Sequence, residues 1–287
     1  MKILVAGGNG EVGYELSDLL CKNHQVYSTY RKNKKNSKKI IWIKADFNER
    51  VNLNIKPDII INCIATHSFS KKKNFIDYLN SNIISVFNLI DFAKQKKVKR
   101  IINISTISVY EKKLKKIVKE NDNYNSSLLD RLAITKSVGE KVLANSDVDY
   151  INLRLPGILC ISKKNNMRPW LHLIIKKLKL NKNIKIYNSQ SKFNSLIDTL
   201  EISKFIERVI RHKNKINDNF NLCSSQPIKL EELINIAKSY FNSKSKVIRI
   251  SNVKTTASII SINKLKNFFN FNPSAAKNII LRNLKYY

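Results

Sequence analysis

Glycine residues crowd the amino-terminal end of this chain. Only six glycines occur among 287 residues, and four of them lie within the first thirteen. The apolar run at 2–6 that precedes them is typical of a buried strand, and the stretch at 11–20 that follows carries apolar residues at a helical period. The sequence therefore predicts a strand, a glycine-rich turn and a helix in direct succession.

A turn of this kind suits a ligand that carries phosphate. The glycines satisfy both G-x-x-G-x-x-G and G-x-G-x-x-G. Glycine lets the backbone approach a diphosphate closely, and the amide groups at a helix N-terminus attract the anion. We therefore expect a dinucleotide here, with a simple tight turn as the alternative. The residues expected at the diphosphate are Gly7, Gly10, Glu11, Val12 and Gly13.

The segment that follows the second predicted strand, at 25–29, is strongly basic. A site for NAD usually carries an acidic residue about twenty positions beyond the glycines, where it binds the ribose 2′-hydroxyl. No acidic residue occurs between Asp18 and Asp46, and Arg31 instead begins a basic run that ends at Lys39. Because an arginine at this place pairs with a 2′-phosphate, the sequence favours NADP over NAD. A solvated basic loop is the alternative interpretation.

Strand and helix patterns alternate through the first half of the chain. Apolar runs at 40–44, 59–65 and 98–104 predict strands, and the periodicity of 75–97 predicts a long helix. The alternation predicts an α/β fold with a Rossmann-type, doubly wound parallel sheet, whose ligands lie at the carboxyl ends of the strands. Four residues that follow strands are then expected near this edge, namely Ala65, Thr66, His67 and Thr106.

The length allows one large domain or two closely joined ones. We expect residues 1–156 to form the dinucleotide-binding domain, to which 194–224 return. Residues 157–193 and 225–287 are expected to form a small, interleaved α/β region that binds the substrate. Within it, the apolar periodicity at 170–180 predicts an amphipathic helix.

The chain is strongly basic, which bears on the partners that it is expected to bind. Lys and Arg number 53 against 21 Asp and Glu, which gives a formal net charge of +32. Such a charge is typical of nucleic-acid or membrane binding, but it is also what an AT-rich genome produces, since Lys, Asn and Ile all abound. The lysines are scattered, no nucleic-acid-binding motif is found, and no apolar run approaches the roughly 18 residues of a membrane span. We therefore expect neither nucleic acid nor membrane as a partner.

Cysteines and histidines are few and dispersed. The four cysteines at 21, 63, 160 and 223 and the four histidines at 24, 67, 172 and 212 form no group with metal-ligand spacing. We expect no metal site, and reduced thiols. The first residues turn to glycine after one short apolar run, which is not a signal-peptide pattern, so a cytoplasmic location is expected.

Taken together, these motifs resemble the extended short-chain dehydrogenase/reductases, in particular their NAD(P)-dependent nucleotide-sugar epimerase, dehydratase and reductase branch. Residues 1–13 resemble the opening strand and glycine motif of that family, and 102–110 resemble the strand that ends in its active-site Ser or Thr, here Thr106. The resemblance implies that Asp46 and Phe47 contact the adenine. It also implies that Asn194, in a segment resembling the one that positions the sugar nucleotide, contacts the substrate.

One departure from the family pattern bears on catalysis. The family carries Tyr-x-x-x-Lys on a helix, and here Lys136 fits this motif whereas Leu132 stands where the tyrosine belongs. In the family the tyrosine exchanges the proton, the lysine lowers its pKa and holds the nicotinamide ribose, and Thr106 matches the residue that binds the carbonyl oxygen. Leucine has no proton to exchange. Tyr124 is the first candidate to replace it, and the alternatives are His67, Glu120 and Asp122, each of which also reads as a surface or packing residue.

The resemblance implies modification of a nucleotide-activated sugar with NADP, or with NAD, for bacterial surface polysaccharide synthesis. Keto reduction is the first choice and epimerisation the second, and Ile107 and Ser108 stand where dehydratases carry Asp-Glu, which disfavours 4,6-dehydration. Leu132 supports an alternative function, that of a dinucleotide-binding sensor or scaffold that has lost catalysis. A homodimer through the helix that carries Lys136 is common in that family.

Overall fold

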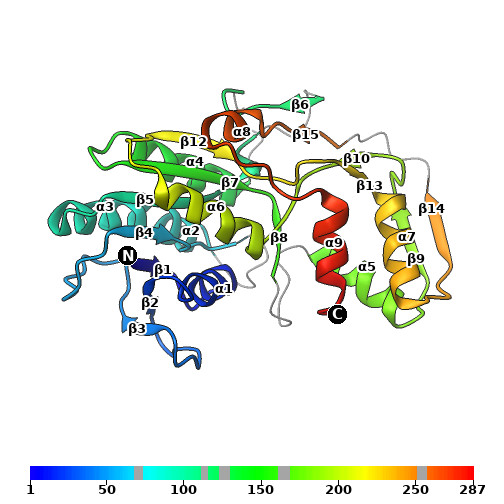
Figure 1. Cartoon of the computed structure of the whole chain (residues 1–287), viewed down its shortest axis with the longest axis horizontal. Helices are drawn as coiled ribbons and strands as arrows, with labels where there is room; N and C mark the ends of the chain where they lie inside the picture. Colours follow the sequence, from blue (N-terminus) through cyan, green and yellow to red (C-terminus); the bar gives the residue numbers. More distant parts are fainter. Residues whose placement is uncertain (68–73, 111–115, 123–129, 161–168, 251–256) are drawn as a thin grey trace. The chain divides into compact units, whose positions relative to one another are not determined.

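The computed structural model describes residues 1–67, 74–110, 116–122, 130–160, 169–250 and 257–287. The chain divides into two compact units, and Figure 1 shows the chain coloured from its amino-terminal to its carboxyl-terminal end. Unit 1 comprises residues 1–112, 121–155 and 203–220, and unit 2 comprises 113–120, 156–202 and 221–287. Unit 1 contains the large parallel sheet.

The sheet of unit 1 has seven strands in the order β12-β7-β5-β4-β1-β2-β3. Its strands are β1 (Lys2–Ala6), β2 (Gln25–Tyr30), β3 (Ile41–Lys44), β4 (Ile59–Asn62), β5 (Arg100–Thr106), β7 (Tyr150–Leu155) and β12 (Asp218–Asn221). Neighbouring strands from β3 across to β7 run parallel. The chain builds outward from β1 to β3 on one side and from β4 to β7 on the other. This order confirms the predicted Rossmann-type, doubly wound sheet, and it creates a switch point between β1 and β4.

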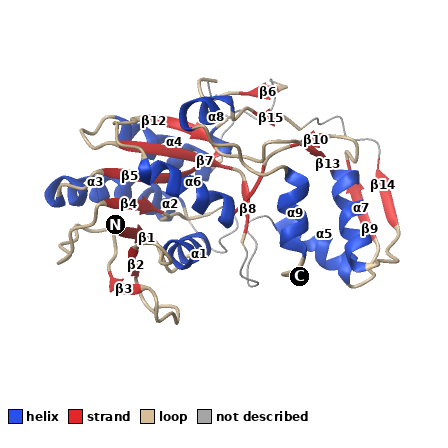
Figure 2. Cartoon of the chain, in the orientation of Figure 1, coloured by secondary structure: helices blue, strands red, loops and turns tan. Residues whose placement is uncertain are grey.

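Helices cover both faces of this sheet (Figure 2). Helix α1 (Glu11–Leu20) connects β1 to β2, whereas α2 (Phe75–Leu79), the π-helical turn η1 (Asn80–Ile84), α3 (Ser85–Lys96) and α4 (Arg131–Ala144) serve the other half of the sheet. The last four elements pack against one another. Right-handed crossovers on the two sides of the switch point place α1 on the face opposite to this group. Helix α6 (Thr199–Arg211) begins in unit 2 and continues into unit 1.

The long helix predicted at 75–97 is present but interrupted. The π-helical turn η1 lies in its middle, where α4 crosses at very short range. A Cβ atom built on Gly139 of α4 would lie 2.3 Å from the backbone oxygen of Asn82. Only glycine allows this approach, and the sequence periodicity alone does not reveal a π turn, since such turns insert a single residue into an otherwise helical pattern.

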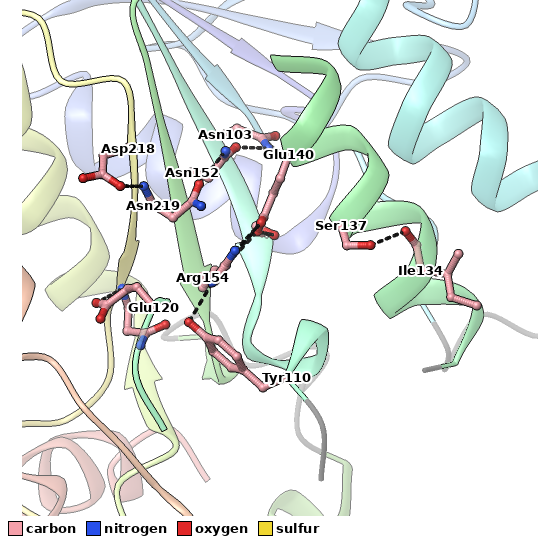
Figure 3. Close-up of polar contacts among 12 residues, drawn as sticks. Asn103, Tyr110, Glu120, Ile134, Ser137, Glu140, Asn152, Arg154, Asp218 and Asn219 are labelled. Atoms are coloured by element: carbon pink, nitrogen blue, oxygen red, sulfur yellow. Dashed lines mark hydrogen bonds and ion pairs between the residues drawn. The ribbon is translucent and has the colours of Figure 1, made fainter. Parts of the chain in front are cut away.

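Four asparagines form a ladder across the sheet, and the first three of them are buried. The Nδ2 atom of Asn62 donates to Oδ1 of Asn103 at 2.9 Å, Asn103 donates to Asn152 at 2.7 Å, and Asn152 donates to Asn219 at 2.8 Å. The first three residues are paired directly across β4, β5 and β7 in the strand register. Figure 3 shows three members of the ladder, Asn103, Asn152 and Asn219. The ladder therefore satisfies side-chain amides inside the sheet, in which every residue of β4 and β7 is buried.

Unit 2 is built from short paired strands and helices. Its strand pairs are β8 (Gly157–Leu159) with β11 (Leu196–Asp198), β9 (Ile184–Tyr187) with β14 (Val247–Ile250), β6 (Ile117–Val118) with β15 (Ile259–Ile260), and β10 (Lys192–Phe193) with β13 (Ile228–Lys229). Its helices are α5 (Pro169–Lys179), α7 (Leu230–Phe241), α8 (Asn263–Phe269) and α9 (Ala276–Leu284). The predicted helix at 170–180 is confirmed as α5. The two-residue strands were not predicted, because two residues are too few to show a period.

The carboxyl-terminal helix α9 is held in unit 2 by buried charges. The guanidinium of Arg282 donates to both carboxylate oxygens of Asp198, at 2.5 and 2.7 Å, and lies 3.0 Å from Glu201 Oε1. Asp198 is fully buried. None of the helices within the described part of the chain is both long enough and apolar enough to cross a membrane.

Candidate functional site

Unit 1 contains a cavity of about 890 Å³ at the switch point of its sheet. The cavity is lined by segments that follow the carboxyl ends of β1, β2, β3 and β4, together with residues of α2 and η1. These lining residues are Gly7, Asn9, Gly10, 29–33, 44–48, 63–66, Asp77, Asn80 and Ser81. Ligands of open α/β sheets bind at this place, outside the carboxyl ends of the strands where the strand order reverses.

The geometry of the glycine loop shows why glycine is required at two of its positions, Gly7 and Gly13. Gly7 has a φ of +77°, and a Cβ atom there would lie 2.8 Å from the backbone nitrogen of Ile64. A Cβ on Gly13 would lie 2.4 Å from the Gly7 oxygen, so that only glycine lets α1 pack onto the loop. Gly10 lines the cavity, and a Cβ there would meet only the Gly7 oxygen, at 3.2 Å. The loop therefore forms an open cradle beside the cavity.

The first turn of α1 completes this cradle. Gly10 is the N-cap residue, and glycine has no side chain that could cap the helix. The first amide groups of any helix have no acceptor within the helix. Glu11 and Val12 begin this helix. A bare helix start beside a glycine cradle fits a dinucleotide diphosphate, since the amide groups and the helix dipole both favour an anion.

The basic residue predicted to bind a 2′-phosphate lies at the edge of this cavity. The Nη1 atom of Arg31 is 3.8 Å from Oδ2 of Asp46, and both side chains are largely exposed. Arg31, which is predicted to bind the 2′-phosphate, and Asp46, which is predicted to contact the adenine, therefore lie next to each other. Phe47 also borders the cavity, but its ring is buried and packs edge-to-face on Phe92, with ring centroids 6.1 Å apart.

The segment after β4 forms the opposite end of the cavity. Ala65 and Thr66 line it, and the hydroxyl of Thr66 donates to the backbone oxygen of Asp77 at 3.2 Å. His67 follows, and its backbone oxygen accepts a hydrogen bond from Tyr78 at 3.1 Å. Burial, together with the smaller effect of the Lys136 charge, lowers the pKa of His67 to about 4, so that the ring is neutral near neutral pH.

Lys136 is a buried cation on α4. Its Nζ atom donates to the backbone oxygens of Ile64, at 3.2 Å, and Ile104, at 2.9 Å. Burial lowers the pKa of Lys136 to about 8, although Cys63 and Glu140 oppose this shift. Burial also raises the pKa of Cys63 to about 12, so its thiol stays neutral near neutral pH and Glu140 is the anion that stabilises the charged lysine. Lys136 is thus held at the edge of the sheet that binds ligands.

Leu132 lies one helical turn before Lys136, in the first turn of α4. Residues four apart share a helix face, so Leu132 and Lys136 lie on the same side of α4. Thr106 ends β5 and is half-buried. Its hydroxyl donates to the Ser108 hydroxyl at 3.1 Å and accepts from the Ser108 amide at the same distance.

A buried network fixes α4 on the sheet behind these residues. Glu140 accepts hydrogen bonds from Arg154 at 2.7 Å and from the Ser105 hydroxyl at 2.5 Å. Arg154 also donates to the hydroxyl of Tyr110 at 2.9 Å, and Figure 3 shows its side chain between Glu140 and Tyr110. The pKa of Arg154 is raised because the hydrogen bond and charge of Glu140 outweigh the effect of burial. The helix that carries Lys136 is therefore locked to β5 and β7.

Tyr124 and Asn194 are the remaining predicted site residues. Tyr124 lies outside the described residues, which omit 123–129. Asn194 belongs to unit 2 and is buried, where its amide donates to the Ile260 oxygen at 2.8 Å and accepts from the Ile260 amide at 2.9 Å. Its described bonds thus tie together segments of unit 2.

Several residues of the site were not predicted from sequence. Thr29 at the end of β2 accepts a hydrogen bond from the Gly7 amide at 2.9 Å, and Asn9 bonds the loop after β2. Asn82 is fully buried and donates to Thr135 Oγ1 at 2.9 Å. The sequence does carry one signal, the capping box of Asn74 and Asp77, which begins the helix that lines the cavity.

Comparison with known proteins agrees with this geometry. Residues 3–223 match the NAD dependent epimerase/dehydratase family. The uncharacterized protein MJ1055 of Methanocaldococcus jannaschii is 26% identical over 272 residues, which cover 85% of this chain and 82% of that protein.

Solved structures share the fold over the whole chain. The UDP-glucuronic acid 4-epimerase of Bacillus cereus in complex with NAD superposes with a TM-score of 0.80 at 18% identity, covering 100% of this chain and 98% of the other. The UDP-glucose 4-epimerase of Thermotoga maritima with UDP-glucose gives a TM-score of 0.82 at 15% identity, with coverage of 100% and 98%. The shared fold, the glycine cradle and the family match over most of the chain lead to one conclusion: this chain belongs to the NAD dependent epimerase/dehydratase family.

Proposed function

We propose that this protein is an NAD(P)-dependent enzyme that modifies a nucleotide-activated sugar. The observation that carries the proposal is the cavity at the glycine loop, which extends to Thr66 beyond β4. The family match, together with relatives solved with NAD and with UDP-glucose, supports these ligand classes. Keto reduction is the proposed reaction and epimerisation the second choice.

The cellular location and the substrate-binding region are proposed on the basis of the same family resemblance. We place the reaction in the bacterial cytoplasm, where it would supply surface polysaccharide synthesis. Residues 157–193 and 225–287, which belong to unit 2, are the proposed substrate-binding region, and Asn194 is proposed to contact the substrate. Thr66 and His67 are proposed to contact the substrate from the loop after β4.

NADP is the proposed cofactor, and NAD is the alternative. Arg31 and Lys32 line the cavity after β2, and no acidic residue ends that strand. The exposed pair of Arg31 with Asp46 is of the kind that contributes about 0–1 kcal/mol, so a 2′-phosphate can displace the carboxylate.

The side chains at the other end of the site have distinct proposed roles. A bound nicotinamide supplies or accepts a hydride. Lys136 uses two of its three N–H groups on Ile64 and Ile104, and the third is proposed to bind the cofactor ribose. The Thr106 hydroxyl, which donates a hydrogen bond to Ser108 in this structure, is proposed to donate one to the substrate carbonyl oxygen instead. Tyr124 is proposed to exchange the catalytic proton.

Turnover of NADPH with nucleotide-linked keto-sugars tests this proposal. The wild-type protein should oxidise NADPH, and Tyr124→Phe should lower kcat by about 10²–10⁴-fold, the typical contribution of a positioned acid or base. Tyr240→Phe, at an exposed tyrosine of α7, is the matched control and should retain wild-type kcat. Unchanged kcat in Tyr124→Phe would assign the proton to another residue.

Leu132 favours a second candidate function, a dinucleotide-binding sensor or scaffold without catalysis. This candidate predicts that the protein binds NADPH but never oxidises it against a keto-sugar nucleotide. It also predicts that Leu132→Tyr, which restores a phenol one helical turn before Lys136, creates turnover that the wild type lacks. Turnover by the wild-type protein rules the candidate out.

A homodimer through α3 and α4 is the proposed assembly. These helices and the turn before α3 expose apolar side chains, namely Ile84, Phe87 and Val138. Burying such residues against a second copy removes apolar surface from water. Analytical ultracentrifugation should show a dimer for the wild type and a monomer for Phe87→Glu.

A further inference from the structure

The loop that follows β2 is rich in cations yet is held close to the protein. Residues 31–40 form this basic loop, which contains six Lys or Arg residues and no acid. It has neither helix nor strand structure. A segment of like charges repels itself and extends unless something ties it down. The contacts that tie this loop down therefore decide where its charges lie.

Asn9 of the glycine loop clamps the basic loop at two backbone atoms. Its Nδ2 atom donates to the backbone oxygen of Asn33 at 2.8 Å, and its Oδ1 atom accepts from the backbone amide of Lys35 at 3.0 Å. A carboxamide can make both bonds at once, because its nitrogen donates while its oxygen accepts. Asn9 lies between Gly8 and Gly10, so the clamp joins the phosphate cradle directly to the basic loop.

Tyr14 of α1 makes a second tether. Its ring stacks on Trp42 of β3, with centroids 6.4 Å apart and an interplanar angle of 12°. The Nζ atom of Lys35 lies 4.6 Å from the centroid of the Tyr14 ring, within the range of a cation–π contact. The Tyr14 hydroxyl also lies 3.4 Å from the backbone oxygen of Asn36. The basic loop is thus fixed along one side.

The clamp has a consequence for the cavity. With Asn33 and Lys35 held at the glycine loop, Arg31, Lys32 and Asn33 form part of the cavity wall. Lys44 lines the same wall from the end of β3. Three cations, Arg31, Lys32 and Lys44, therefore line a cavity that the glycine cradle also borders, which matches a dinucleotide with one additional phosphate.

We infer that Asn9 is a positioning residue that determines the preference for the phosphorylated dinucleotide, because its clamp holds the cations of the basic loop at the cavity wall. The inference rests on the proposed function and deepens it. Asn9 would act through the loop and not through contact with the additional phosphate. Its loss should therefore affect NADP⁺ far more than NAD⁺.

Titration calorimetry of the full chain with NADP⁺ and NAD⁺ tests the inference. Asn9→Ala should weaken NADP⁺ binding by about tenfold or more, because two hydrogen bonds that position the cations are lost, while NAD⁺ affinity should change by less than about threefold. Asn9 is not among the residues with positive φ, so alanine suits its backbone. Asn36→Ala is the matched control, because the tether at Asn36 uses its backbone oxygen.

A second variant and a structural measurement keep the test decisive if Asn9→Ala folds poorly. Tyr14→Leu removes the other tether and should also reduce the preference for NADP⁺. Hydrogen exchange at the Lys35 amide should accelerate in Asn9→Ala and stay slow in Asn36→Ala, since the amide donates to Asn9. This exchange is measured on the free protein and requires no cofactor.

The outcomes separate this inference from the proposed function. A wild-type preference for NADP⁺ that Asn9→Ala and Tyr14→Leu both keep would overturn the inference and leave the cofactor assignment standing. Equal loss of NADP⁺ and NAD⁺ binding in Asn9→Ala would also overturn it, because Asn9 would then act on the shared diphosphate. A wild type that prefers NAD⁺ would remove both the inference and the NADP assignment, and one that binds neither would remove the proposed function itself.

Discussion

Neighbouring glycines in the amino-terminal turn have different physical roles. Gly13 is enclosed by backbone, since a Cβ atom there would lie within 3.0 Å of atoms of both Gly7 and Gly8. Gly10 faces the cavity, and its only close neighbour within 4 Å would be one carbonyl oxygen. A methyl group should therefore disturb packing at Gly13 and ligand approach at Gly10.

Alanine substitutions should separate these two roles. Gly13→Ala should lower the free energy of unfolding by about 1–3 kcal/mol, because backbone atoms must move to admit the methyl group. Gly10→Ala should change the free energy of unfolding by less than about 1 kcal/mol but weaken dinucleotide binding, since the methyl group enters the space beside the cradle. Urea denaturation and titration calorimetry measure the two effects. Equal losses of stability in both variants would contradict this division.

Lys136 should titrate far below the other lysines. Burial lowers its pKa from 10.5 to about 8, because few polar groups replace the water around its ammonium. In a protein with ¹³C-labelled lysine side chains, NMR should show one resonance that titrates near pH 8 and that Lys136→Met removes. A resonance of Lys136 that titrates above pH 10 would contradict the burial argument.

The same shift makes a signed contribution to stability. Between pH 8 and 10.5 the folded chain has released the Lys136 proton, whereas the unfolded chain still binds it. Stability therefore rises with pH across this window relative to Lys136→Met. Chemical denaturation at several pH values measures the difference between the two proteins.

At the scale of elements, α4 and β7 are joined by a buried ion pair. Glu140 and Arg154 each expose only 4% of their side chains. Removing one partner leaves the other charge buried without compensation, which typically costs about 3–5 kcal/mol. Replacing both Glu140 and Arg154 by apolar residues removes both charges, so that no unpaired charge is left buried.

We therefore predict that the double variant is more stable than either single variant. Arg154→Met alone should lower the free energy of unfolding by about 3–5 kcal/mol, and Glu140→Leu with Arg154→Met should recover much of that loss. Urea denaturation of the three proteins measures the coupling. Additive losses in the double variant would show that the pair contributes no joint term.

The stability of the asparagine ladder should depend strongly on Asn103, one of its two inner members. Asn103 bonds on both sides, so Asn103→Leu leaves polar groups of Asn62 and Asn152 buried without partners, at about 1–3 kcal/mol each. Asn219→Ala removes only the terminal bond, at a half-buried position, and should cost less. Thermal or urea unfolding of the two variants tests the order, and a larger loss in Asn219→Ala would contradict it.

At the scale of the whole molecule, the net charge of +32 acts against the folded state. Like charges repel more strongly in a compact chain than in an extended one, and salt screens that repulsion. The melting temperature should therefore rise as sodium chloride increases from about 20 to about 300 mM. Differential scanning calorimetry measures this rise. A fall in melting temperature over the range would show that screened ion pairs outweigh the repulsion.

Much of unit 1 could be predicted because its signals are local. The strand, glycine turn and helix of the cradle lie within the first twenty residues. Parallel strands that are buried on both faces have sequences that are nearly continuous apolar runs, which is why β4 and β5 were recognised from sequence. The two-residue strands of unit 2 and the π turn at Asn80–Ile84 leave no such pattern and were missed.

The linear chain thus specifies which residues form strands, helices and the phosphate cradle, because each depends on neighbours a few positions away. The folded chain decides which distant side chains meet. Asn9 finds its partners 24 and 26 residues away, and Lys136 finds its carbonyls 72 and 32 residues away. Such pairs depend on strand order, register and helix placement, which no local pattern encodes, so the clamp on the basic loop and the burial of Lys136 follow only from the tertiary fold.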